Sequence, residues 1–498
     1  MLTEKVDMKM NKQKKTGETV WTSYSPEDFK KLNELCGLYE DFLSTCKTER
    51  EAAAEAVREA QAAGYRNLDD VLREGQKLKP GDKVYAVNMK KAIALFQIGK
   101  RPLSDGMRIL GAHIDSPRMD VKQHPLYEGE GLAYFDTHYY GGIKKYQWVT
   151  IPLAIHGVVA KKDGSIVDVV IGEDDNDPIF CVTDLLIHLA KEQMEKKGST
   201  VVEGEDLDVL IGSRPLMTQE GDRADEKAVK EAVKANTLQL LKEKYGIEED
   251  DFISAELEIV PAGRARDMGF DRSMVAAYGQ DDIVCAYTSL YAMLHTDEVQ
   301  EYTGCCLLVD KEEIGSVGAT GMTSRFFENT VAQLLYACRP DAAGQAAENS
   351  AFGQGACFDL LLRQALKNSK MLSSDVSAAF DPLYASSFDK KNSAFFGKGL
   401  VFNKYTGARG KSSSNDANAE YVAFVRRVMD DAGVAFQTAE LGRVDAGGGG
   451  TIAYISAVYD MDVIDSGVAV LSMHSPLEVT SKADIYEAAK GYAAFLKA

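Results

Sequence analysis

Two stretches of alternating helix and strand patterns, separated by a middle segment rich in strands and loops, constrain the fold of this 498-residue chain most strongly. The first stretch opens with an alanine-rich amphipathic helix over residues 48–63, and strands are predicted at 83–87, 92–98 and 108–113. The second stretch starts near Tyr278. Its predicted elements are helices at 283–294, 326–338 and 417–431, strands at 305–309, 434–440 and 468–473, and a last helix from Ser481. Such alternation is typical of a layered α/β domain.

The middle of the chain has a different character. Strand patterns at 149–160 and 165–171 flank a Lys-Lys-Asp-Gly run at 161–164, which predicts a β-hairpin. The other patterns of this segment are a charged helix and a strand, at 224–245 and 252–260.

The length of the chain also bears on its division into domains. A chain of 498 residues exceeds the usual size of a single hydrophobic core. We therefore predict a discontinuous α/β domain formed by residues 1–120 and 271–498. A β-rich domain of residues 121–270 is inserted into it.

An apolar strand pattern ends in two neighbouring glutamates, Glu312 and Glu313, where the chain enters a loop that contains glycine. Two adjacent carboxylates repel each other unless one is protonated or a cation lies between them. One of them can bind a metal ion while the other accepts a proton from a water molecule. The pair therefore predicts a metal site that has its own general base.

Two of the seven histidines lie at the ends of strand patterns, and Ser-Pro closely follows each of them. His113 and Asp115 share one face of their strand, so the Asp115 carboxylate can orient the His113 ring while the other ring nitrogen binds a metal. His474 ends the pattern at 468–473. A single histidine would more simply be a core or surface residue, but two of them beside a glutamate pair favour a metal site.

Three more carboxylates are candidate ligands. Asp281 and Asp282 open a helical pattern, where acidic residues are also favoured by the helix dipole. Asp375 follows an apolar segment, and it could equally be a turn aspartate. Spacing alone does not decide between these interpretations.

Composition excludes several classes of function. The net charge of −19 disfavours nucleic acid and anionic membranes as partners. The apolar runs are shorter than the ~20 residues of a membrane-spanning helix. The eight cysteines are scattered and lie mostly in apolar runs, which predicts reduced thiols in a cytoplasmic protein.

Five motifs, taken in their order along the chain, resemble the aspartyl-aminopeptidase-like family of dinuclear zinc metallo-aminopeptidases. The motifs are the segments 111–117, 281–282, 312–315, 374–376 and 473–476. The resemblance extends through the inserted region and covers nearly the whole chain. It implies that the layered α/β domain is a zinc-peptidase catalytic domain and that the inserted β-rich domain serves dimerisation.

The resemblance also implies a set of site residues. Two zinc ions per chain are expected, with His113 and Asp375 at one ion, Glu313 and His474 at the other, and Asp281 as the bridge between them. Glu312 resembles the general base of the family, and Asp115 the partner of His113. Relatives often carry asparagine where Asp282 stands, so the choice between Asp281 and Asp282 as the bridge stays open here. Cobalt or manganese can replace zinc at such ligands.

The activity implied is removal of the N-terminal residue from peptides that have a free N-terminus, with acidic residues as the best-known preference of the family. One alternative is a related dinuclear zinc carboxypeptidase or deacylase. Another is a non-enzymatic assembly protein with structural metals. Glu312 argues against the latter, because a structural site needs no general base.

The resemblance finally implies an assembly. The β-rich inserted domain offers apolar surface for subunit contacts, and the family forms homodimers joined into a dodecamer. His188 resembles the histidine that the inserted domain contributes to the active site of a neighbouring subunit. A histidine on an ordinary helix is the alternative interpretation.

Overall fold

The computed structural model describes residues 19–217, 230–339 and 358–498. Within these residues the strands form three sheets, of nine, six and five strands. The nine-stranded sheet, called the central sheet below, has the order β1-β2-β3-β13-β4-β14-β18-β16-β17. Its strands are β1 (Arg66–Asn67), β2 (Lys83–Asn88), β3 (Ala92–Gln97), β4 (Met107–His113), β13 (Thr303–Val309), β14 (Lys370–Ser374), β16 (Leu400–Asn403), β17 (Phe436–Ala439) and β18 (Asp462–Gly467).

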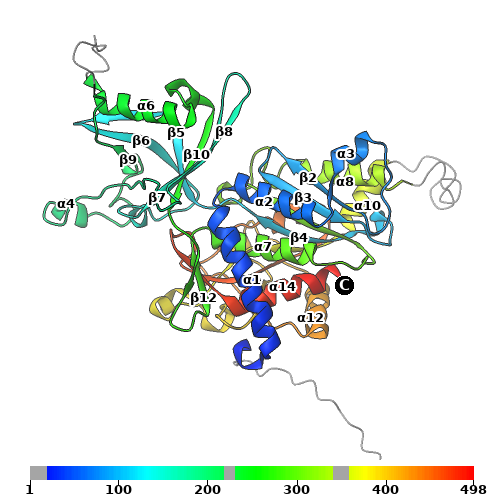
Figure 1. Ribbon diagram of the computed structural model, residues 1–498. Coiled ribbons are helices and arrows are strands. Elements are labelled where there is room, and N and C mark those ends of the chain that lie inside the picture. Colours follow the sequence, from blue (N-terminus) through cyan, green and yellow to red (C-terminus); the bar gives the residue numbers. More distant parts are fainter. Residues whose placement is uncertain (1–18, 218–229, 340–357) are drawn as a thin grey trace, which may run out of the picture.

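Helices cover both faces of the central sheet (Figure 1). One face packs on α1 (Pro26–Thr45), α2 (Glu49–Ala62), α7 (Gln280–Leu294), α12 (Ala419–Ala432) and α14 (Lys482–Leu496). The other face packs on α3 (Leu68–Arg73), α8 (Phe326–Ala337), α10 (Phe358–Lys367) and α13 (Ala453–Ala457). Along β13, Cys306 and Leu308 point to the first face, and Cys305 and Leu307 point to the second. A strand covered on both sides needs a continuous apolar run, which explains its sequence.

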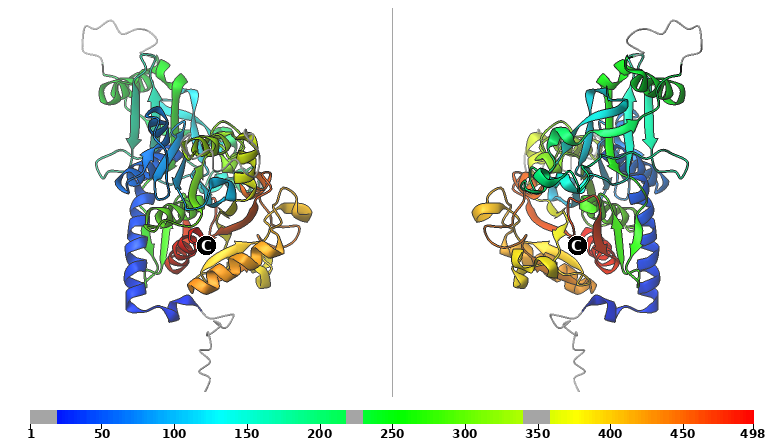
Figure 2. Two further views of the ribbon diagram at one scale, coloured as in Figure 1. Left: turned by 90° about the vertical axis from the view of Figure 1, so that its right-hand side faces the viewer. Right: turned by 90° about the vertical axis from the view of Figure 1, so that its left-hand side faces the viewer.

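The six-stranded sheet, called the insert sheet below, is antiparallel and has the order β8-β7-β10-β5-β6-β9. Its strands are β5 (Arg118–Gly129), β6 (Leu132–Tyr140), β7 (Leu153–Ala160), β8 (Ile166–Ile171), β9 (Val209–Gly212) and β10 (Ala255–Pro261). The helix α6 (Ala232–Tyr245) packs on this sheet, and the short helix α4 (Lys191–Met194) lies in the segment between β8 and β9. A core of its own surrounds the buried Trp148. This part stands beside the central sheet and its helices in all three views (Figures 1 and 2).

The five-stranded sheet, called the C-terminal sheet below, has the order β11-β12-β20-β19-β15. Its strands are β11 (Arg266–Met268), β12 (Met274–Ala277), β15 (Ser377–Ala378), β19 (Ala469–Leu471) and β20 (Glu478–Ser481). In this sheet β12, which follows the insert sheet in the sequence, pairs with β20, one of the last two strands of the chain.

The α/β class predicted from the alternating patterns is confirmed by this architecture. The predicted hairpin is also present, because β7 and β8 pair with Ala160 opposite Ile166. The predicted strand at 252–260 starts late: a 3-10 helix over Glu249–Ser254 precedes β10. The helix expected at 224–245 is described from Ala232 onward, and residues 224–229 lie outside the described part of the chain.

The boundaries at residues 120 and 271 stay a prediction. The insert sheet itself runs from Arg118 to Pro261. Among the residues that the structure describes, no helix is long and apolar enough to cross a membrane.

Candidate metal centre

Most of the predicted ligands gather at the carboxyl ends of the parallel strands of the central sheet. His113 is the last residue of β4, and Asp375 directly follows β14. Glu312 and Glu313 open a short 3-10 helix (Glu312–Ile314) that comes shortly after β13. Parallel strands end at the same edge of a sheet, which is where open α/β proteins place their functional groups.

The two remaining ligands come from segments that flank the C-terminal sheet. Asp281 lies in the first turn of α7, shortly after β12. His474 lies in the turn between β19 and β20. Because β12 pairs with β20, these two distant segments of the chain reach the same place.

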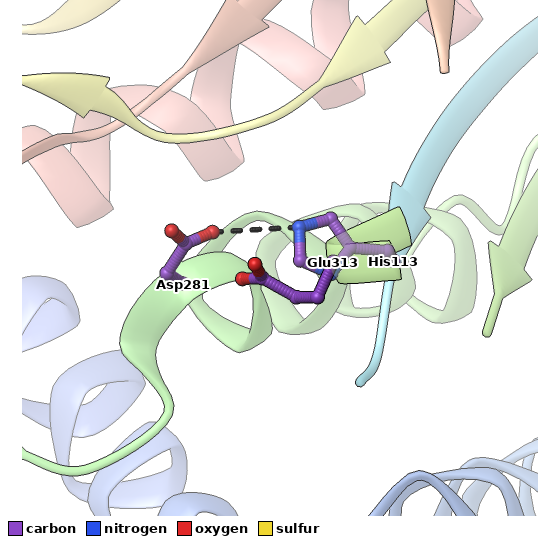
Figure 3. A group of neighbouring side chains, drawn as sticks. All are labelled: His113, Asp281 and Glu313. Carbon is purple, nitrogen blue, oxygen red and sulfur yellow. Dashed lines mark ion pairs between the residues drawn. The ribbon is translucent and has the colours of Figure 1, made fainter. Parts of the chain in front are cut away.

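Asp281 lies between the two histidines. Its Oδ1 is 3.4 Å from His113 Nε2, and its Oδ2 is 3.2 Å from His474 Nε2. Glu313 Oε2 is 3.5 Å from the same His474 nitrogen. Figure 3 shows His113, Asp281 and Glu313 converging from the end of β4, the start of α7 and the segment after β13. Each oxygen of one carboxylate thus faces a different imidazole.

Both histidine rings are held through their Nδ1 atoms. His113 Nδ1 is 2.9 Å from the backbone oxygen of Asp115 and 3.3 Å from its carboxylate. His474 Nδ1 is 2.9 Å from the carbonyl oxygen of Gly142. A carbonyl oxygen only accepts, so Nδ1 donates in each ring. The neutral ring then presents an unprotonated Nε2, the form that binds metals.

Three overlapping groups of these side chains have ligand atoms within 4.8 Å of one another. The groups are His113 with Asp281 and Glu313, His113 with Glu312 and Asp375, and Asp281 with Asp282 and Asp375. Asp375 is grouped both with His113 and with the two neighbouring aspartates, whereas His474 belongs to none of the three groups and is placed at the centre by its distances to Asp281 and Glu313. Asp282 also lies within the cluster, next to Asp281.

The cluster holds more negative charge than its surroundings stabilise. Burial raises the pKa of Glu313 and of Asp375 well above the usual range. Burial and the nearby Asp281 carboxylate raise the pKa of Glu312 to about 7, against the opposing effect of His113. Burial also acts on Asp281, but the positive charge that His113 and His474 can carry on either side of it keeps its pKa low. An excess of buried carboxylates is the setting in which a cation is stabilising.

Unpartnered oxygens in the described residues support the same conclusion. Glu313 Oε1 and both carboxylate oxygens of Asp282 are buried without a hydrogen-bond partner. A buried charge is costly unless it is paired or binds a metal. Imidazole nitrogens and carboxylate oxygens are ordinary zinc ligands. The donor set of this cluster therefore fits zinc.

His188 lies apart from this cluster within the chain. It occupies an exposed turn of the inserted region, shortly before α4, and belongs to none of the three ligand groups found among the described residues. The ordinary helix considered as the alternative is wrong, because residues 187–189 form a turn. Leu185, Leu186 and Ile187 beside it are exposed as well.

Three residues that support the site were missed by the sequence analysis. The Tyr140 hydroxyl donates to Asp115 Oδ2 over 2.8 Å, and the carbonyl of Gly142 accepts from His474. The buried Glu478 carboxylate accepts from the backbone N–H groups of Asp281 and His474, over 2.9 and 2.7 Å. The Gly141-Gly142 pair that directly follows β6 was a sequence feature that could have indicated a close backbone approach.

Imidazole and carboxylate side chains that cluster at the carboxyl edge of an α/β sheet, with a further carboxylate beside them, are typical of a metal-dependent hydrolase. The family model of the aminopeptidase I zinc metalloproteases (M18) matches residues 42–496. The chain is 58% identical over 479 residues to a protein of Clostridium acetobutylicum described as a probable M18 family aminopeptidase 1, covering 96% of this chain and 98% of that protein. The chain belongs to the M18 family of zinc aminopeptidases.

Solved structures of aminopeptidases have the same fold as this chain. The crystal structure of an M18 family aminopeptidase from Thermotoga maritima matches with a TM-score of 0.86 at 43% identity, over 96% of this chain and 99% of that one. The mApe1 dodecamer of S. cerevisiae matches with a TM-score of 0.70 at 19% identity, over 94% of this chain and 97% of that one. The latter likeness concerns the fold alone. The expected family and aminopeptidase activity are confirmed, and the carboxypeptidase, deacylase and assembly alternatives are not favoured.

Proposed function

We propose that the chain removes the N-terminal residue of peptides with two zinc ions bound per chain. His113 and Asp375 would hold one ion, Glu313 and His474 would hold the other, and Asp281 would be shared between them. The observation that carries this proposal is the position of Asp281, whose two oxygens each face a different histidine. The same geometry favours Asp281 over Asp282 as the bridge.

In the proposed hydrolysis the zinc ions and the side chains Glu312 and Asp115 have different roles. Zinc ions bound there would supply Lewis-acid chemistry, which lowers the pKa of a water molecule and polarises a carbonyl group. Glu312 accepts the proton of that water and passes it to the leaving amine. Its burial favours this role, since burial raises the pKa of the carboxyl group toward neutral. Asp115 keeps the His113 ring in its binding orientation.

Blocked peptides test the aminopeptidase activity. We expect release of free amino acids from peptides with a free N-terminus, and none from the same peptides after N-terminal acetylation, because the α-amine is bound beside the ions. Amidation of the C-terminus should leave the rate unchanged and serves as the control. The same panel, varied at the first residue, measures the preference for acidic residues. Cleavage that depends on a free C-terminus would contradict the proposal.

We further propose that the chain forms a homo-oligomer, with a dodecamer as the expected form. The turn around His188 supports this: Leu185, Leu186, Ile187 and Leu189 are 47%, 54%, 68% and 68% exposed. A run of exposed aliphatic side chains is typical of a subunit contact. The S. cerevisiae mApe1 assembly is a dodecamer with the same fold.

In such an assembly His188 would reach the metal centre of a neighbouring subunit and donate a hydrogen bond to the oxyanion of the tetrahedral intermediate. His188→Phe should then lower kcat by about 10²- to 10³-fold, as the loss of one such donor does. Metal content and the mass measured by light scattering should not change. An unchanged kcat would remove His188 from the mechanism, and a fully active monomer would refute the shared site.

A cytoplasmic location is proposed as well. The cysteines that the structure describes are free, and most of them are buried. This pattern is usual in a reducing compartment.

A further inference from the structure

Three consecutive residues at the end of β6, Tyr140, Gly141 and Gly142, contact the groups that hold the metal ligands. We propose that this β6 tripeptide is the positioning element of the metal centre, so that the inserted domain completes the site of its own chain. The inference rests on the proposed zinc function and extends it. It concerns contacts inside one chain and does not depend on a neighbouring subunit.

Tyr140 acts through Asp115. Its hydroxyl donates to Asp115 Oδ2 over 2.8 Å. The same carboxylate accepts from the backbone N–H groups of Glu312 and Glu313, over 3.1 and 3.2 Å, and lies 3.3 Å from His113 Nδ1. Asp115 is fully buried, and these hydrogen bonds hold its carboxylate in one orientation. The Tyr140 hydroxyl therefore fixes a carboxylate that orients both His113 and the glutamate pair.

The Tyr140 ring is itself held in place. The guanidinium carbon of Arg118 lies 4.0 Å from the centre of the ring. Arg118 is buried and pairs with Glu258 over 2.9 Å and with Glu49 over 3.5 Å. Glu258 belongs to β10 of the insert sheet and Glu49 to the first turn of α2. Arg118, and with it the Tyr140 ring, is therefore held by residues from both the insert sheet and a helix that covers the central sheet.

The two glycines act through close backbone approach. Gly141 has a φ of +75°, and a Cβ there would lie 3.4 Å from Glu313 Cβ. The Gly142 carbonyl accepts from His474 Nδ1 over 2.9 Å. A Cβ on Gly142 would lie 3.3 Å from that same nitrogen. A side chain at Gly141 is disfavoured by its positive φ, and a Cβ at Gly142 would make a tight contact that the His474 ring has to yield to.

Together the three residues support ligands of both proposed zinc sites: His113 in one, and Glu313 and His474 in the other. Partners that orient metal ligands typically account for 10- to 100-fold in metal affinity. Loss of the tripeptide contacts should therefore weaken metal binding directly. This effect is separate from any effect on subunit assembly.

Tyr140→Phe is the sharpest test, because it removes the hydroxyl and keeps the ring on Arg118. We expect zinc affinity, measured by competition with a chromophoric chelator, to fall by about 10- to 100-fold. The absorption spectrum of the cobalt-loaded protein should also change, since His113 is no longer held in one orientation. Tyr421→Phe is the matched control: Tyr421 is buried, and its hydroxyl donates to the Met371 carbonyl over 2.8 Å, outside the centre.

Gly142→Ala provides a second, independent test. The added methyl group should displace the His474 ring and alter the cobalt spectrum. Gly129→Ala is its control within the inserted domain, because a Cβ at Gly129 meets no atom within 4 Å. If Tyr140→Phe fails to fold, Gly142→Ala decides the question.

The results distinguish a failure of the positioning role from a failure of the proposed dinuclear zinc centre. A folded Tyr140→Phe protein whose zinc affinity and cobalt spectrum match those of wild type would overturn the positioning role. So would a change no larger than that of Tyr421→Phe. A wild-type protein that fails to bind two zinc ions would instead overturn the proposed dinuclear centre.

Discussion

Glu312→Gln is expected to lower kcat by about 10²- to 10⁴-fold, the usual contribution of a general base. Glutamine has nearly the same size and can occupy the same buried position, but it cannot accept the proton of the attacking water. The zinc content should stay at the wild-type value, because Glu312 is not proposed as a ligand. Steady-state kinetics on an unblocked dipeptide, together with metal analysis of the same preparation, measures both quantities.

Glu313→Gln is the matched comparison, since it makes the same chemical change one residue further along. Glu313 Oε2 lies 3.5 Å from His474 Nε2, on the proposed second zinc site. This variant should lose metal as well as activity. If instead Glu312→Gln lost metal and Glu313→Gln kept it, the roles within the pair would have to be exchanged.

Removal of metal should abolish activity altogether. The proposed ligands are His113, Asp281, Glu313, Asp375 and His474, and burial raises the pKa of Glu313 and Asp375 well above the usual range, so that a bound cation would stabilise their charged forms. We expect two metal ions per chain by elemental analysis, and complete loss of hydrolysis after dialysis against a chelator. Addition of zinc, cobalt or manganese should restore it.

The chelator experiment has a direct control. The same chelator, saturated with zinc beforehand, should leave the enzyme fully active, because it has no free capacity to remove the ions. Preparations that are active with fewer than one zinc, cobalt or manganese ion per chain would refute the dinuclear proposal.

His113 and the pair Glu312 and Glu313 could be predicted as metal-site candidates because strand ends carry a strong local pattern, whereas the roles of Asp281 and Asp375 followed only from the family resemblance. The runs that end at His113 and Glu312 are apolar, since β4 and β13 lie inside the central sheet with both faces covered. A polar residue directly after such a run marks the sheet edge. Which histidine faces which oxygen of Asp281 depends on the C-terminal sheet, and no local pattern encodes that pairing.

Other features were missed for identifiable reasons. The long helix α1 begins with a capping box, in which Ser25 and Asp28 bond each other's backbone, and with Pro26 in its first turn. These signals are readable in the sequence and predict the start of a helix at this position. The support from Tyr140 and Gly142 was not readable, because it joins the inserted domain to ligands that lie far away in the sequence.

The position of β4 in the central sheet has a consequence for the synthesis of the chain. Leu110 pairs with Cys306 of β13 on one side and with Leu372 of β14 on the other. Both partners leave the ribosome long after β4 does, whereas the antiparallel insert sheet pairs strands that are nearer in sequence and can form in the interval. Until β14 emerges, β4 keeps an open edge that can pair with other nascent chains. Chains truncated before residue 370 should therefore aggregate, and the full-length chain should depend on chaperones that shield this edge during translation.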